Sequence, residues 1–280
     1  MGELRDLEFD RPEPLEPPPP PSRGMGPLLL VALLIVAVVG GYVWYMRRGT
    51  PGPAAEPTDV AADVTREPGT PLGGEPEAVD VPPLDESDGV VRDLVQRLSS
   101  HPTVLAWLAT DGLIRNFTVS VQNIAAGRTP ARHQSRLRPE SGFTVREQDG
   151  RFTIDPAGYR RYDALADAVA SVDAEGAAKL YATLKPRIEE AYDDLGFPDT
   201  SFDEPLERAI VTLLQVPVLD EEPAVVARGV GYAYADARLE NLTAAQKQLL
   251  RMGPRNVRLI QAKLEEIARA LGIPADGLPR

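Results

Sequence analysis

The chain has 280 residues, a net charge of −12 and no cysteine. The absence of cysteine excludes disulfide bonds, thiol catalysis and thiolate metal sites, and two histidines are too few for most zinc sites without cysteine. The acidic balance argues against a nucleic-acid-binding surface, so we expect no nucleic acid partner, no metal and no cofactor.

Residues 1–26 form a polar leader with seven prolines, five of them in the run Pro17–Pro21. Such a run adopts polyproline II and forms no core. We therefore predict a disordered, proline-rich leader that is solvated. Docking of the run into an aromatic groove is the alternative interpretation.

The most apolar stretch follows directly and contains 19 consecutive residues, 28–46, without a charge. As a helix with a rise of ~1.5 Å per residue it would cover about 28 Å, enough for the hydrocarbon core of a bilayer. Arg47 and Arg48 end the run. The leader is long and net acidic, and no small-residue cleavage site follows, so we predict an uncleaved transmembrane signal anchor over residues 27–48.

This anchor predicts where the rest of the chain lies. We expect the short leader in the cytoplasm and the large carboxyl-terminal part in the periplasm or at the cell exterior, in a single-pass protein of the plasma membrane. The flanking arginines, three before the span and two after it, are nearly balanced and do not decide the orientation alone. Residues 28–46 would contact the lipid bilayer, and Ala37 and Gly41 have the small-xxx-small spacing that allows a homodimer.

Residues 49–84 contain eight prolines, five glycines, seven acids and no aromatic residue. A segment of this composition buries too little apolar surface to offset its ordering entropy, so it predicts a disordered acidic tether. We expect a globular α+β domain over residues 85–272 and a short tail, 273–280.

Helical periodicity dominates this domain. Apolar stripes predict helices over about 90–98, 103–126, 174–195, 203–215 and 254–271, and Thr243 with Gln246 forms a capping box for a further short helix. Asp155-Pro156 has the pattern of a helix start. The fold class is therefore mainly α (α+β), with one transmembrane helix and a mostly helical soluble domain.

Two segments predict a small β element. Asp149-Gly150 lies between two alternating runs and is a strong signal for a two-residue hairpin turn. Residues 224–235 alternate between larger and small residues and predict a single strand, whose small face implies close approach of another element.

Signatures of common enzymes are missing from the sequence: there is no phosphate-binding glycine loop, nucleophile elbow or zinc-protease motif. Arg132, Arg136 and Arg138 belong to the one dense basic run, which is either a contact for an anionic partner or charge that protects an edge strand. A second run, residues 159–162, combines two tyrosines with two arginines and is interpreted as surface decoration.

Three phrases in this domain resemble a known family. DGLIR at 111–115, AYDDLGFPD at 191–199 and YAYADARLENLTAAQKQLLRMGP at 232–254 resemble the bacterial domain of unknown function 3014 family, over about residues 84–271. The resemblance implies a membrane-anchored protein of the bacterial cell envelope. It carries over no catalytic or binding residue.

Together these features predict a membrane-tethered envelope domain that acts as a non-enzymatic interaction module, with an unidentified envelope protein or an anionic polymer as its partner. A hydrolase acting on a cell-wall polymer is the first alternative, and a spacer or oligomeric scaffold is the second. Buried carboxylates lining a cleft would favour the hydrolase.

Overall fold

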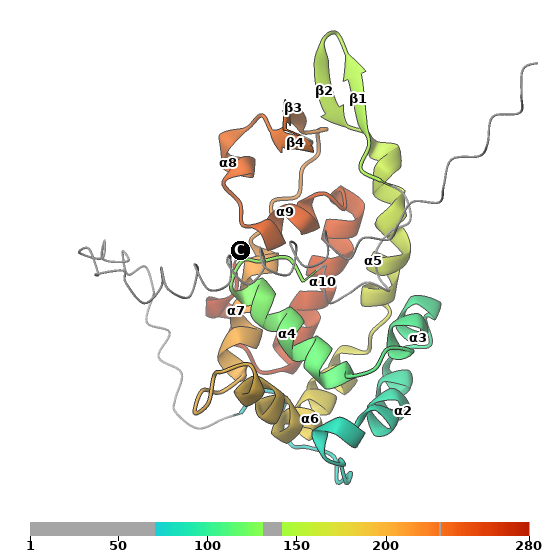
Figure 1. Cartoon of the computed structure of the whole chain (residues 1–280), viewed down its shortest axis with the longest axis vertical. Coiled ribbons are helices and arrows are strands. Elements are labelled where there is room, and N and C mark those ends of the chain that lie inside the picture. Colours follow the sequence, from blue (N-terminus) through green and yellow to red (C-terminus); the bar gives the residue numbers. More distant parts are fainter. Residues whose placement is uncertain (1–70, 131–141, 230, 280) are drawn as a thin grey trace, which may run out of the picture. The chain divides into compact units, whose positions relative to one another are not determined.

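The computed structural model describes residues 71–130, 142–229 and 231–279, which form a mainly helical unit with one small sheet (Figure 1). In chain order its elements are η1 (Leu84–Glu86), α2 (Asp88–Leu98), α3 (Pro102–Leu108), α4 (Leu113–Ala125), β1 (Val145–Gln148), β2 (Arg151–Ile154), η3 (Pro156–Tyr162), α5 (Asp163–Ala170), α6 (Ala174–Asp194), α7 (Asp203–Leu214), β3 (Ala224–Arg228), β4 (Gly231–Tyr234), α8 (Ala237–Glu240), α9 (Ala244–Leu250), α10 (Pro254–Ala270) and η4 (Ala275–Gly277). A small antiparallel sheet beside many helices confirms the predicted α+β class.

The described part of the chain contains no helix that is both long enough and apolar enough to cross a bilayer. The predicted span at residues 28–46, with Ala37 and Gly41, lies outside the described residues, as does the leader 1–26. The single-pass anchor therefore stays a prediction from the sequence.

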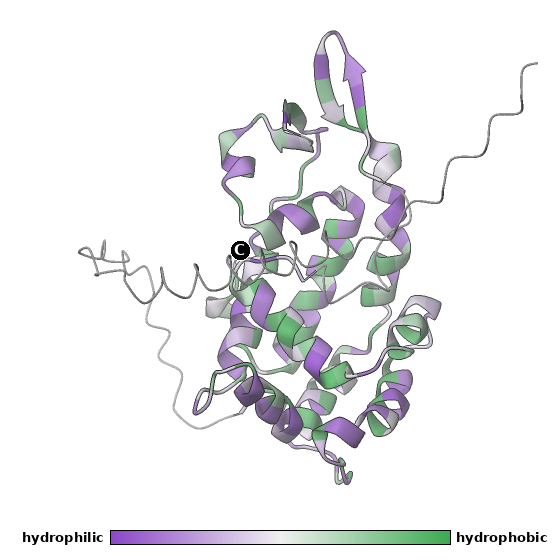
Figure 2. Cartoon of the chain, viewed as in Figure 1, coloured by the Kyte–Doolittle hydropathy of each residue, from purple (hydrophilic) through white to green (hydrophobic). Residues whose placement is uncertain are grey.

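Helix α10 connects the two hydrophobic cores of the described unit. Its first half contributes Val257 and Ile260 to a core shared with α9 and the sheet, and its end contributes Ala268 to a core built from α2, α4, α6 and α7. Leu264 packs against both cores. Figure 2 shows the helices carrying hydrophilic and hydrophobic residues side by side, as amphipathic helices do. One long apolar stripe thus lets a single helix serve both cores.

The packed unit begins before residue 85, the predicted start of the globular domain. Leu72 is fully buried in the core that contains α6 and α7, and the Gly73 N–H donates to the Leu271 carbonyl (3.1 Å). Residues 71–73 therefore belong to the domain, although the composition around them is rich in proline and glycine.

The sheet is antiparallel with the strand order β1-β2-β3-β4. Its first hairpin turns at Asp149 and Gly150, whose φ angles are +52° and +72°. Two successive residues with positive φ are what a type I′ turn requires, and the predicted hairpin is confirmed. Strand β2 continues the sheet by placing Phe152 opposite Val225 of β3.

The prediction of a single strand over residues 224–235 is wrong. The segment forms two strands, β3 and β4, and the chain reverses directly after Arg228. Gly229 has a φ of +58°, a conformation that glycine adopts without the Cβ clash that other residues meet. Because of the reversal, Val226 and Tyr232 lie on opposite faces of the sheet instead of sharing one.

Glu240, at the end of α8, fastens strand β4 to helix α9. Its carboxylate accepts hydrogen bonds from the Tyr234 N–H (3.0 Å) and from Lys247 Nζ (3.1 Å). The bond from the Tyr234 backbone, followed by the bond from Lys247, lowers the pKa of Glu240. The fold therefore stabilises the charged form of this side chain.

Replacing Glu240 by glutamine is expected to lower the free energy of unfolding by about 1 kcal/mol near neutral pH, because the amide offers both donors a weaker acceptor. A lowered pKa contributes stability that is present above the unfolded pKa of about 4.3 and is lost as the pH falls through the folded pKa. The gap between wild type and variant should therefore close below about pH 4. Urea titrations at several pH values measure it.

Glu265→Gln removes an exposed carboxylate from α10 and serves as the control, with an expected change within about 0.5 kcal/mol. A gap for Glu240→Gln that stays constant into the acid range would contradict the role given to its charge.

Candidate functional site

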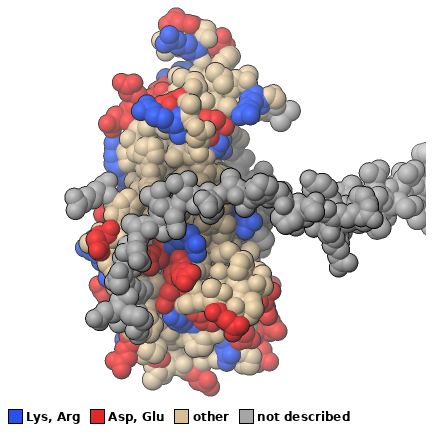
Figure 3. Space-filling view, turned by 90° about the vertical axis from the view of Figure 1, so that its left-hand side faces the viewer, with Lys and Arg blue, Asp and Glu red and all other residues tan. Residues whose placement is uncertain are grey.

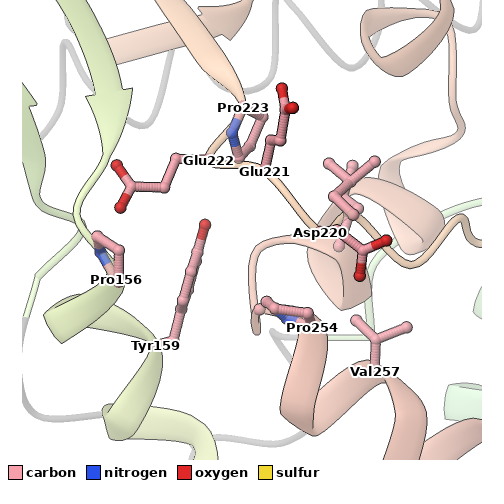
Figure 4. Close-up of a pocket in the computed structure, with 11 residues that line it drawn as sticks. Pro156, Tyr159, Asp220, Glu221, Glu222, Pro223, Pro254 and Val257 are labelled. Atoms are coloured by element: carbon pink, nitrogen blue, oxygen red, sulfur yellow. The ribbon is translucent and has the colours of Figure 1, made fainter.

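A pocket of about 240 Å³ lies where three segments meet: η3, the loop 219–223 that leads into β3, and the start of α10 (Figure 4). Its walls include Pro156, Pro223 and Pro254, whose rings have no side-chain rotamers to order when a ligand binds. Tyr159 stands in the pocket with its hydroxyl directed toward the loop. The pocket thus combines rigid apolar walls with one phenol group.

Residues at the start of α10 pack against Tyr159 and fix its position. Gly253, with a φ of +86°, lies so close to the ring that a Cβ at this position would be 2.4 Å from Cγ of Tyr159. Asn256 is 1% exposed, and its Nδ2 donates to the Tyr159 carbonyl (3.3 Å) and to Asp163 Oδ1 (2.9 Å). Both the ring and the backbone of Tyr159 are therefore fixed by residues at the start of one helix.

The phenol of Tyr159 is neutral at physiological pH. Burial, followed by the nearby charges of Glu222 and Asp155, raises its pKa to about 12. Among the residues that the structure describes, its hydroxyl has no hydrogen-bond partner. It can therefore donate or accept a hydrogen bond when a ligand enters.

Three consecutive acidic residues form the rim of the pocket, and all three are exposed. Asp220 pairs with Arg258 (2.7 Å), and Glu222 accepts a hydrogen bond from the Thr153 hydroxyl (3.2 Å). Glu221 has no hydrogen bond or ion pair with any described residue. The rim therefore presents negative charge to whatever approaches.

The described residues provide no cluster that could hold a metal ion, and three of their carboxyl groups have a lowered pKa. No three His, Asp or Glu side chains of residues 71–130, 142–229 and 231–279 are placed to hold a metal ion. Hydrogen bonds from neighbouring groups lower the carboxyl pKa of Asp236, Glu240 and Glu266, and none of these side chains lines the pocket. A carboxylic acid that donates a proton at neutral pH needs the opposite shift.

A second polar cluster joins α6 to α7 beside an open hollow of about 360 Å³. Asp203 accepts hydrogen bonds from the Tyr181 hydroxyl (2.6 Å) and from Lys185 Nζ (2.6 Å). Burial, followed by the bond to Asp203, raises the pKa of Tyr181, so its proton is held rather than released. The three side chains satisfy one another's hydrogen-bonding groups, and we infer that the cluster stabilises the fold.

The predicted partner-binding residues Arg132, Arg136 and Arg138 lie outside the described residues and stay a prediction. On the face shown in Figure 3, the acidic and basic side chains of the described residues are interspersed.

The run 159–162 does not form the single surface patch expected from the sequence. Tyr159 enters the pocket, and Tyr162 is 7% exposed in the core beneath the sheet. The guanidinium of Arg161 lies 4.8 Å from the centroid of the Tyr162 ring. The sequence does not predict that Tyr159 faces an acidic loop, because that loop is about 60 residues further along the chain.

No curated protein and no solved structure matches the chain. The family described as "Protein of unknown function (DUF3014)" matches residues 113–268, which is more than half of the chain. The match covers the end of the first family phrase and the whole of the other two, together with every segment that lines the pocket. The chain therefore belongs to the DUF3014 family.

Proposed function

We propose that this chain is a single-pass membrane protein whose domain stands outside the cytoplasm and acts as a non-enzymatic interaction module of the cell envelope. The uncharged run 28–46 supports the membrane anchor, and the proline- and acid-rich composition between Arg48 and Leu72 supports a tether.

The observation that carries the interaction role is the construction of the pocket. A ligand pocket of a small-molecule enzyme commonly has a volume of about 300–1,000 Å³, whereas this one is smaller, open to solvent and rimmed by charged side chains. Its phenol group, on the half-buried Tyr159, has a pKa of about 12 and retains its proton. These features suit recognition of a group on a partner better than proton transfer.

The hydrolase alternative has less support. Glycoside cleavage requires two carboxyl groups that face each other across a cleft, one of them protonated at neutral pH. The rim acids are instead exposed, and Asp220 is paired with Arg258. A pure spacer or scaffold, for its part, would need no pocket.

The test is site-specific photo-crosslinking in living cells, with the full chain carrying a benzophenone side chain at Ala157, an exposed residue that follows Pro156 of the pocket wall in the chain. We expect a discrete protein adduct in the membrane fraction. Reversing two rim charges with Glu221→Lys and Glu222→Lys should remove it, because like charges across an interface are strongly unfavourable.

The same probe at Leu105, an exposed residue of α3, serves as the matched control and should not give this adduct. An adduct that survives the charge reversal would show that the pocket is not the contact. The absence of an adduct from both positions, with a folded chain in the membrane, would leave the spacer as the better explanation.

A further inference from the structure

We propose that the pocket at Tyr159 receives one basic side chain, the ammonium group of a lysine or the guanidinium group of an arginine, from a partner protein. This inference rests on the proposed interaction function and specifies its ligand. The pocket volume, the charge of its rim and the free phenol point to the same chemistry.

The volume selects a side chain rather than a whole small molecule. At about 240 Å³ the pocket lies below the usual range of ligand cavities, about 300–1,000 Å³. Its apolar walls, which include Pro156, Pro254 and Val257, can cover the methylene groups of a long side chain. Such a side chain would leave its charged end at the rim.

The charge at the rim selects a cation. Asp220, Glu221 and Glu222 line the opening, and Arg258 compensates only the first of them directly. Arg146 lies 3.7 Å from Glu222 but is shared with another carboxylate, so negative charge remains in excess. A cation that enters would meet Glu221, which has no partner among the described residues.

Tyr159 provides an observation that does not depend on the acids. Its hydroxyl points into the pocket and has no partner within the described residues, and its ring forms part of the wall (Figure 4). A phenol oxygen accepts a hydrogen bond from an N–H donor, and the face of an aromatic ring attracts a cation. One residue can therefore hold both the polar end and the stem of a basic side chain.

The amino-terminal end of α10 lies at the same pocket and would favour an anion, but its effect is smaller. The interaction of a helix terminus with a charge is modest and is screened by salt, and Pro254 at the first position has no N–H to donate. The negative charge that Arg258 and Arg146 leave uncompensated at the opening outweighs this effect.

The experiment uses the full chain in detergent micelles with 3-fluorotyrosine at its tyrosine positions. The ¹⁹F signal that disappears in the Tyr159→Phe variant is assigned to residue 159. Nα-acetyl-lysine amide should shift this signal in a saturable way, with a dissociation constant on the order of 1–10 mM. Nα-acetyl-norleucine amide, which has a similar stem and no charge, should not.

Glu221→Gln combined with Glu222→Gln should weaken lysine binding at least about tenfold, and added salt should weaken it in the wild type. Glu86→Gln combined with Glu265→Gln removes the same charge from exposed positions outside the pocket and should leave binding unchanged. Circular dichroism checks that each variant is folded.

Equal shifts with the lysine and norleucine derivatives, or no saturable shift with lysine and arginine derivatives, would overturn the basic-side-chain assignment. If the crosslink from Ala157 persists in that case, the interaction function stands with a different ligand. If binding of the lysine derivative is seen and the crosslink is absent, the pocket chemistry stands and the proposed function fails.

Discussion

Replacing Asp203 by alanine should lower the free energy of unfolding of the full chain by about 3 kcal/mol, because removing one member of a largely buried ion pair leaves the other charge uncompensated. The side chains of Lys185 and Asp203 are 20% and 16% exposed, so the lower end of the usual 3–5 kcal/mol range applies. The Tyr181 hydroxyl would lose its acceptor as well. The Leu72 N–H, 3.4 Å from Asp203 Oδ2, links the same carboxylate to the beginning of the packed unit.

Urea denaturation followed by circular dichroism measures this loss, with the chain in a mild detergent. Glu204→Ala is the matched control, since it removes an exposed acid from the same first turn of α7 and should cost less than about 1 kcal/mol. Asp203→Ala combined with Lys185→Met should cost less than the sum of the two single changes, by about 1–3 kcal/mol. Additive losses would mean that the pair contributes no coupling energy.

The helices were predictable because their apolar residues recur with the period of a helix. The last helix is the clearest case: its stripe, its Pro254 start and its Gly272 stop all appear in the structure. The hairpin at Asp149-Gly150 was predictable for a similar reason, since the turn requires two residues that tolerate positive φ.

The second hairpin was not predictable by alternation alone. Alternation has a period of two, so a chain reversal between Arg228 and Gly231 leaves the pattern nearly intact in the sequence while it changes which residues share a face. The burial of Leu72 was not predictable for a different reason. Composition describes an average over residues 49–84, whereas one leucine that is fully buried is enough to bind the chain to the core.

Residues of the three family phrases make contacts that join distant segments of the fold. Arg115, in the first phrase, pairs with Asp194 in the second, and it also pairs with Asp85 at 2.8 Å. Glu240 and Gly253, in the third phrase, fasten β4 and support Tyr159. The pocket depends on such long-range contacts, so its parts were visible in the sequence but their meeting point was not.

Replacing Gly253 by alanine should cost about 2–6 kcal/mol of unfolding free energy. Non-glycine residues at a backbone conformation like this one lose about 1–3 kcal/mol, and an atom forced into a packed site adds about 1–3 kcal/mol. Both terms apply here, because φ is +86° and the new Cβ would lie 2.4 Å from Cγ of Tyr159. The ring would have to move, so the variant should also lose the pocket and its affinity for a basic side chain.

Gly272→Ala separates the two causes, because Gly272 follows the same helix with a φ of +81° and has open space where a Cβ would lie. It should cost only about 1–2 kcal/mol, the backbone term alone. Tyr159→Ala removes the ring that Gly253→Ala would strike, so the two changes together should cost about 1–3 kcal/mol less than their sum. Urea titrations of the wild type and the four variants measure these losses. If Gly253→Ala and Gly272→Ala lose equal stability and the pair at 253 and 159 is additive, the start of α10 does not hold Tyr159, and the pocket is positioned by η3 alone.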